Sequence, residues 1–305
     1  MPISWYPGHM HKARKQLSAT MRDTELVIEI LDARAPQASS NPLLAELRGA
    51  LPCIKVLNKA DLANPELTRL WQRFFASQPN TRCLVNGLDK LLTRSALMSV
   101  CRELVTRNTH PAHRHQVLIT GIPNVGKSTF LNQILARKVA RTGNEPAVTK
   151  GQQKVKLEEN WFLVDSPGMM WPKLEDQQAA YRLAVLGSIR NTAIDLEDIG
   201  WFAAETLLAG FYLQLQSRYR LETRPADTEE LLTRIATGHG CLGRGGHVDW
   251  HKVSELLLGD LRSGRLGRIT LENPPSPDST ADPALETAMD SVLDSSSSSS
   301  TDQTN

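Results

Sequence analysis

The sequence predicts an α/β fold, in which helices cover both faces of a mostly parallel sheet, followed by a small all-helical domain. In the first part of the chain, short apolar runs typical of buried parallel strands alternate with helical stretches. From about residue 176, strand-like runs give way to helical periodicity, as in Leu183, Leu186 and Ile189. These two observations place the sheet before the helical domain.

Individual elements follow from the same patterns. Apolar runs predict strands at 26–31, 53–57, 83–85 and 116–120. Two segments near 153–157 and 161–164 predict a hairpin. Helices are expected near 65–77, near 91–107, from Lys127 onward, and in a basic stretch at 7–22.

We expect three parts in the chain: a first domain at 1–175, a helical domain at 176–271, and a disordered acidic, serine-rich tail at 272–305. The net charge is only +2, but all 35 Lys and Arg precede residue 269. Seven of the 33 acidic residues lie in the tail, so residues 1–271 carry a net charge of +9. This favours a polyanionic partner such as RNA. A solvated surface with excess basic residues is the alternative.

Composition argues against membrane and disulfide-rich classes. No apolar run reaches the roughly 18 residues that span a membrane, and the first ten residues lack a signal-peptide pattern. The four cysteines are scattered, without a Cys-x-x-Cys pair, which favours small core residues in a reducing compartment. We therefore expect a cytoplasmic protein.

A phosphate-binding loop follows the strand at 116–120. Residues 121–128 match the pattern Gly-x-x-x-x-Gly-Lys-Ser. The glycines let the backbone curl so that N–H groups point at phosphates near a helix N-terminus. Lys127 should reach the β- and γ-phosphates, and Ser128 should ligate Mg²⁺. A ligand-free glycine turn is the alternative, but the order strand, loop, helix favours the phosphate site.

A guanine-reading motif, Asn-Lys-Ala-Asp, ends the strand at 53–57. The Asp61 carboxylate can accept two N–H bonds from guanine, whereas adenine would leave it unpaired. Asn58 can bond the other edge of the base, and the Lys59 stem can lie over the ring. The alternative for Asp61 is a helix N-cap. The expected base-binding residues are Asn58, Lys59, Ala60, Asp61, Asn86 and Gly87.

A sensor for the γ-phosphate, Asp-Ser-Pro-Gly at 165–168, follows the strand at 161–164. Asp165 should hold Mg²⁺ through water, and the Gly168 N–H should bind the γ-phosphate. Thr149 is the expected switch threonine on the metal, with Thr142 as the alternative. The expected phosphate-binding residues are Asn124, Val125, Gly126, Lys127, Ser128, Thr129 and Gly168, and the expected metal ligands are Ser128, Thr149 and Asp165.

The motifs stand in an unusual order. An ordinary small GTPase runs phosphate loop, sensor, base reader, whereas here the base reader comes first. This order indicates a circularly permuted P-loop GTPase domain. The site survives permutation because every motif lies at the carboxyl end of a parallel strand. The sensor leads directly into the helical domain, so a γ-phosphate-dependent shift is expected to move that domain.

Over residues 1–270 the chain resembles the bacterial ribosome biogenesis GTPase A family of circularly permuted GTPases. The resemblance rests on the nucleotide motifs together with Trp5–Met10, Asp32–Pro36, Trp171–Lys173, Gly240–Leu242 and Gly245–Gly246. It implies a GTPase that binds GTP and GDP with Mg²⁺. It also implies late maturation of the large (50S) ribosomal subunit, with rRNA binding and release on hydrolysis.

The resemblance also bears on catalysis. Met169 stands where many GTPases have a water-orienting glutamine. In the family a histidine of the Pro-Gly-His element is implicated in hydrolysis, which implies a catalytic role for His9 beside Lys127. The alternatives for His9 are RNA contact or local packing. An asparagine at the position of Asn124 helps related GTPases to hold K⁺ near the phosphates, so K⁺ is expected as a further cofactor.

Three other functions stay open. One is a nucleotide-gated RNA-binding module with incidental hydrolysis, and another is a mitochondrial ribosome assembly GTPase. The third is an ATPase or nucleoside kinase, against which Asp61 argues. We expect the favoured assembly factor to be monomeric off the ribosome.

Two further groups of residues can be explained either by a function or by structure alone. His110, His113 and His115 lack a cysteine or carboxylate at ligand spacing, so we expect a solvated linker rather than a metal site. The glycine-rich stretch at 238–246 either meets RNA phosphates or forms a tight loop between core helices.

Overall fold

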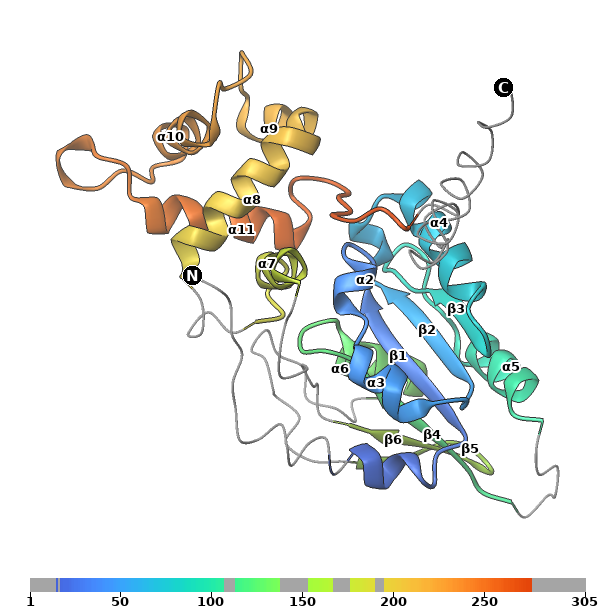
Figure 1. Cartoon of the computed structure of the whole chain (residues 1–305). Coiled ribbons are helices and arrows are strands. Elements are labelled where there is room, and N and C mark those ends of the chain that lie inside the picture. The colour runs from blue at the N-terminus through green and yellow to red at the C-terminus, as the bar shows by residue number, and fades with distance from the viewer. Residues whose placement is uncertain are drawn as a thin grey trace, which may run out of the picture. The chain divides into compact units, whose positions relative to one another are not determined.

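The computed structural model describes Lys15 and residues 17–106, 113–137, 153–166, 176–189 and 195–275 (Figure 1). His9, Thr149, Gly168 and Met169 lie outside these residues, as do the start of the basic helix and residues 276–305. The end of that helix is described at 17–21. Among the helices that the structure describes, none is long and apolar enough to cross a membrane.

A six-stranded sheet in the order β3-β2-β1-β4-β6-β5 forms the centre of the first part of the chain. Every neighbouring pair is parallel except β5 and β6, which form the expected antiparallel hairpin. The predicted mostly parallel sheet is therefore confirmed. The strands are β1 (Leu26–Asp32), β2 (Cys53–Asn58), β3 (Thr81–Val85), β4 (His115–Thr120), β5 (Gln153–Glu158) and β6 (Trp161–Asp165).

The central strand β1 is buried along its whole length, which explains its nearly continuous apolar sequence. Alternate side chains point to opposite faces of a strand. Ile28 and Ile30 accordingly share a core with Met98 and Phe130 of the helices on one face, whereas Val27 packs with Leu44 on the other. The helices around the sheet are α2 (Pro36–Ser39), α3 (Pro42–Arg48), α4 (Pro65–Ala76), α5 (Arg94–Leu104) and α6 (Lys127–Leu135).

Two of these helices, α2 and α3, were not identified from the sequence. Both are short and begin with a proline, and the Asn41 side chain caps α3 by accepting a hydrogen bond from Leu43 N at 3.0 Å. The Asn41-Pro42 pair was the sequence signal from which the start of α3 could have been predicted. Helices of four and seven residues show too little periodicity to be recognised by it.

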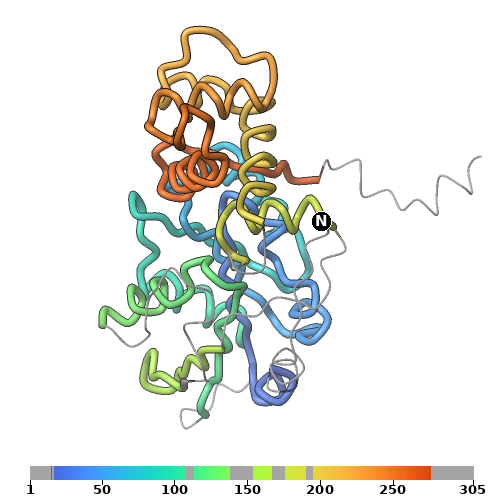
Figure 2. The backbone as a smooth tube through the Cα atoms, turned by 90° about the vertical axis from the view of Figure 1, so that its left-hand side faces the viewer, coloured from blue at the N-terminus to red at the C-terminus, as the bar shows by residue number. Residues whose placement is uncertain are grey.

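The second part of the described chain is helical, as predicted. Its helices α8 and α11 lie side by side (Figure 1 and Figure 2). At their crossing, a Cβ on Gly200 would lie only 2.2 Å from Ser254 Oγ, so glycine is required there. The helices are α7 (Gln177–Val185), α8 (Leu196–Gly210), α9 (Tyr212–Tyr219), α10 (Thr228–Gly238) and α11 (Trp250–Ser263).

After α11 the chain returns to the first part of the molecule (Figure 1). Ile269 N donates to Leu62 O at 3.0 Å, and Leu271 N donates to Arg34 O at 2.7 Å. Residues up to Glu272 form one compact unit. Glu272, which the sequence analysis placed in the tail, thus belongs to the folded body.

The Glu272 carboxylate binds the returning chain to two helices of the folded body. It accepts hydrogen bonds from Gln37 N at 2.8 Å and Ala38 N at 3.1 Å, at the start of α2, and lies 3.6 Å from Arg182 of α7. Burial raises the pKa of Glu272, and the two N–H groups and Arg182 oppose that rise. One carboxylate therefore fastens three separate segments.

We expect Glu272→Ala to lower the free energy of unfolding by roughly 1–3 kcal/mol, because the buried Ala38 N–H and the partly buried Gln37 N–H lose their acceptor. The measurement is urea denaturation followed by circular dichroism. A matched control is Glu103→Ala, since Glu103 forms an exposed ion pair with Arg82 and should change stability by less than about 1 kcal/mol. Equal effects of the two substitutions would contradict the role given to Glu272.

Candidate nucleotide site

The carboxyl ends of five strands bring the sequence motifs to one edge of the sheet. Asp32 ends β1 directly opposite Asn58 at the end of β2, and Asp165 at the end of β6 pairs with Ile119 of β4. The phosphate loop follows β4, and Asn86 follows β3. Ligands of open α/β sheets bind at this edge.

The phosphate loop has the backbone that its glycines allow. Asn124 and Gly126 have φ angles of 62° and 90°, in the left-handed region, and Gly126 is the N-cap of α6. A Cβ on Gly126 would lie 2.4 Å from Asn58 Nδ2, and one on Gly121 would lie 2.7 Å from Ile30 O. Lys127, Ser128 and Thr129 form the first turn of α6, where N–H groups favour an anion.

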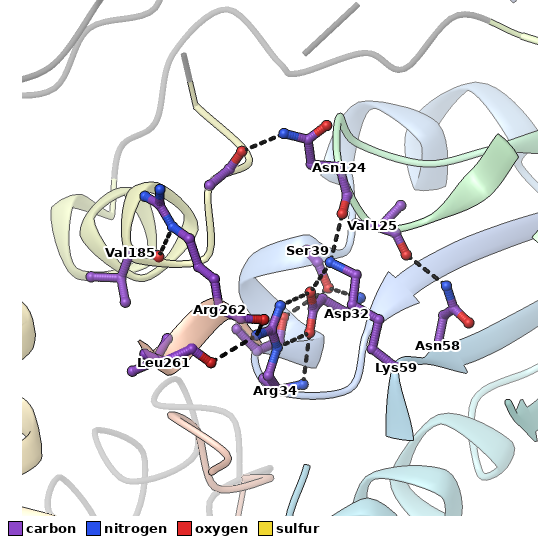
Figure 3. A network of polar contacts seen from close by, with 12 residues as sticks. Asp32, Arg34, Ser39, Asn58, Lys59, Asn124, Val125, Val185, Leu261 and Arg262 are labelled. Atoms are coloured by element: carbon purple, nitrogen blue, oxygen red, sulfur yellow. Dashed lines mark hydrogen bonds and ion pairs between the residues drawn. The ribbon is translucent and has the colours of Figure 1, made fainter. Parts of the chain in front are cut away.

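Direct hydrogen bonds join the phosphate loop to the guanine-reading motif (Figure 3). Asn58 Nδ2 donates to Val125 O at 2.8 Å, and Lys59 Nζ donates to Asn124 O at 2.6 Å. Asn58 Oδ1 accepts from Asn86 Nδ2 at 2.7 Å. Both ends of the Asn58 amide thus contact protein, so this residue holds two loops together.

The loops after β2 and β3 carry the predicted base-binding residues. Lys59 has a left-handed φ of 58° and precedes a 3-10 helix, Ala60–Leu62. Ala60 N donates to Asn86 O at 3.1 Å, and Asp61 Oδ1 accepts from Leu88 N at 3.0 Å. A Cβ on Gly87 would lie 2.7 Å from Asp61 N. The structure therefore brings the predicted base-binding residues together.

Lys127 and Asp165 form an ion pair through Nζ and Oδ1, with side chains that are 6% and 0% exposed. The other carboxylate oxygen, Asp165 Oδ2, is buried and has no hydrogen-bond partner among the described residues. A buried carboxylate oxygen without a hydrogen-bond partner, on a residue paired with the neighbour of Ser128 in sequence, suits Mg²⁺, which prefers oxygen ligands. These residues fit the expected ion, whereas Thr149 and Gly168 lie outside the described residues.

A buried carboxylate that the site prediction omitted lies at the centre of this edge. Asp32 is 1% exposed, and its oxygens accept from Arg34 Nε at 2.9 Å, Arg34 Nη2 at 2.8 Å and Lys59 Nζ at 2.9 Å. Burial alone would raise the pKa of Asp32, but Arg34 and Lys59 outweigh it and hold that pKa well below its ordinary value. Asp32 therefore stays ionised and fixes both cations.

The same network reaches the helical part (Figure 3). Arg34 Nη1 donates to Arg262 O at 3.3 Å, and Arg262 Nε donates to Val185 O at 2.7 Å. From the phosphate loop, Asn124 Nδ2 donates to Gly187 O at 2.7 Å. The ends of α7 and α11 are thus bonded to the nucleotide edge. Arg262 carried no sequence signal, and Asp32 and Arg34 appeared only within a family element.

Comparisons with known proteins decide the family. The ribosome biogenesis GTPase A of Bacillus pumilus is 38% identical over 283 residues, which cover 90% of this chain and 100% of that protein. The chain belongs to the ribosome biogenesis GTPase A family. Residues 116–198 match a family model described as 50S ribosome-binding GTPase. The mouse mitochondrial ribosome-associated GTPase 1 is 28% identical over 298 residues, covering 88% of this chain and 89% of that protein.

Solved structures agree on the fold. The crystal structure of GNP-bound YlqF from Thermotoga maritima matches with a TM-score of 0.62 and 25% identity, over 87% of this chain and 99% of that one. A GDP-bound YlqF structure matches with a TM-score of 0.60. The predicted circularly permuted GTPase fold is confirmed, and this member of the GTPase A family is a GTPase that binds guanine nucleotides.

We expect Gly126→Ala to weaken GDP binding roughly tenfold or more, because the new Cβ meets Asn58 at a left-handed φ that costs about 1–2 kcal/mol. The measurement is titration of a fluorescent GDP analogue, with circular dichroism as a check on folding. Gly259→Ala is the control, since a Cβ at Gly259 in α11 meets nothing within 4 Å. Unchanged affinity of Gly126→Ala would show that the loop does not need this contact.

Proposed function

We propose that this GTPase is an assembly factor for late maturation of the large (50S) ribosomal subunit. In this proposal it binds rRNA in the GTP state and is released on hydrolysis. Its relatives are named ribosome biogenesis GTPase A and mitochondrial ribosome-associated GTPase 1, which supports a role in ribosome assembly. The observation that carries the cycle is the polar network that joins the nucleotide edge to the helical part.

The proposed site uses the residues predicted from the sequence. Lys127 binds the β- and γ-phosphates, and Asp61 reads guanine. Asp165, Ser128 and Thr149 hold Mg²⁺, which would offset phosphate charge when bound. On nucleotide binding, the γ-phosphate would compete with Asp165 for the Lys127 ammonium. That exchange is the local electrostatic event by which the site senses GTP.

Transmission to the helical part follows from the contacts of α7. The end of α7 accepts hydrogen bonds from Arg262 of α11 and from Asn124 of the phosphate loop. A shift of the phosphate loop therefore alters a bond to Gly187, and through α7 it reaches α11. A two-state arrangement of these packed elements would convert nucleotide state into a change of ribosome affinity.

The proposed RNA contacts come from the basic body and from the loop between α10 and α11. This loop is exposed from Leu242 to His247, and its base is closed by Gly243 N donating to His247 O at 2.8 Å. Cys241 anchors it in the core, and Arg244 is exposed. An exposed glycine-rich loop with a cation suits phosphate contacts. We further propose a monomer off the ribosome, in the cytoplasm.

The decisive experiment compares cosedimentation with large subunits in the presence of a GTP analogue and of GDP, together with single-turnover hydrolysis with and without subunits. We expect binding only in the GTP state and stimulation of roughly tenfold or more.

His9→Ala should keep GTP binding but lose stimulation, because we propose that His9 orients the attacking water. His251→Ala, on an exposed position of α11, is the matched control.

Binding without stimulation would favour the alternative, a nucleotide-gated RNA-binding module. Equal binding to large subunits with the GTP analogue and with GDP would exclude the proposed cycle. Wild-type stimulation in His9→Ala would remove His9 from the mechanism while leaving the assembly role intact.

We also propose that Asn124 helps to hold K⁺ beside the phosphates. Its amide nitrogen donates to Gly187 O at 2.7 Å, which fixes this side chain at the phosphate loop. We expect faster hydrolysis in K⁺ than in Na⁺, and no difference between the salts for Asn124→Gly. Glycine suits this test because it tolerates the φ of 62° at this position. Equal wild-type rates in both salts would contradict the proposal.

A further inference from the structure

A cluster of metal-ligating side chains lies at the amino ends of β1 and β4. Glu25 immediately precedes β1, and His115 begins β4, two residues after His113. Glu25 Oε2 lies 2.6 Å from His115 Nδ1, and Glu25 Oε1 contacts His113 Nε2. All three potential ligand atoms lie within 4.8 Å of one another.

We propose that Glu25, His113 and His115 bind a divalent transition-metal ion, with Zn²⁺ as the expected species. Two imidazoles and one carboxylate are a zinc ligand set that leaves a position open for water. Around a tetrahedral zinc with bonds of roughly 2.1 Å, ligand atoms are about 3.4 Å apart, so only small side-chain rotations are needed. Hard cations such as Mg²⁺ prefer an all-oxygen shell, which this cluster lacks.

The backbone holds these ligands before any metal arrives. Parallel pairing of β1 with β4 sets their spacing, and Glu25 N donates to Gln116 O at 2.9 Å. His115 N donates to Asn160 O at 2.8 Å, and the His115 ring stacks on Trp161 with centroids 4.4 Å apart. His113 packs edge-on against His115 at 4.8 Å. The imidazole of His115 therefore has a fixed position and orientation.

Exposure of the cluster suits capture of an ion from solution. The side chains of His113, Glu25 and His115 are 31%, 25% and 13% exposed, so the ligands are reachable but shielded on one side. A metal here would tie the starts of β1 and β4 to the β5–β6 turn at Asn160 and Trp161. Its role would be to stabilise this end of the sheet.

The proposed site is separate from the nucleotide site. Glu25 immediately precedes the seven-residue strand β1 and Asp32 ends it, which at about 3.3 Å per residue places them roughly 23 Å apart. The expected solvated linker is wrong for His115, which is a strand residue with a stacked ring. The carboxylate that the sequence analysis did not find comes from Glu25, 88 positions before His113.

The test is calorimetric titration of the untagged full chain with ZnCl₂ while excess Mg²⁺ and GDP fill the nucleotide site. We expect one equivalent of Zn²⁺ to bind, and Glu25→Gln and His113→Ala each to weaken binding roughly tenfold or more. His251→Ala should bind like the wild type. Because His113 and Glu25 are partly exposed, these variants should fold, and their affinity for a fluorescent GDP analogue should be unchanged.

A second measurement uses thermal unfolding and Co²⁺ absorption. Zn²⁺ should raise the melting temperature of the wild type but not that of Glu25→Gln, and Co²⁺ should give visible bands that Glu25→Gln abolishes. Absence of wild-type binding would overturn the proposal and leave a carboxylate that is hydrogen-bonded by two imidazoles. Binding that Glu25→Gln and His113→Ala leave unchanged would place the ion elsewhere, which also overturns it.

Discussion

The buried carboxylate of Asp32 is the interaction on which the nucleotide edge depends. A carboxylate that is 1% exposed is strongly destabilising unless cations accompany it. The Asp32 carboxylate therefore binds Arg34 and Lys59 and holds both side chains in place. Lys59 goes on to bind the phosphate loop at Asn124 O, and Arg34 binds the end of α11 at Arg262 O. Base reader, phosphate loop and helical part thus share one electrostatic anchor.

The interactions of Asp32 lie at the carboxyl edge of the sheet, which does not depend on the order in which the chain connects the strands. The base reader and the phosphate loop follow β2 and β4, which flank β1 on either side. Their contact through Asn58 and Val125 requires only that β2 and β4 run parallel to the strand β1 between them. Permutation changes which loops connect the strands, and it leaves the carboxyl edge as the place where the loops meet. The consequence lies after β6, where the chain continues into the helical part.

The helical part is attached at both of its ends. Near its start, α7 accepts a hydrogen bond from Arg262 and the following Gly187 accepts one from Asn124, and after α11 the chain runs back to Leu62 and Arg34. Glu272 then caps α2, which follows the Asp32 loop. Several of these attachments therefore meet the same edge of the sheet as the nucleotide motifs. In the proposed cycle, these hydrogen bonds are the route by which nucleotide state would reach the helical part.

The sequence by itself determined the strands, the helices α4, α5 and α6 beside the sheet, and the placement of the base reader and the phosphate loop at one sheet edge. Buried parallel strands need continuous apolar runs, and phosphate loops need glycine at fixed spacing, so both leave local patterns. Tertiary structure alone decided the partners of single polar residues. Arg262 meets Arg34 across 228 positions, and Glu25 meets His113 across 88. Such residues look like ordinary surface charges in a sequence, because their role comes from burial and from a partner that only folding brings near.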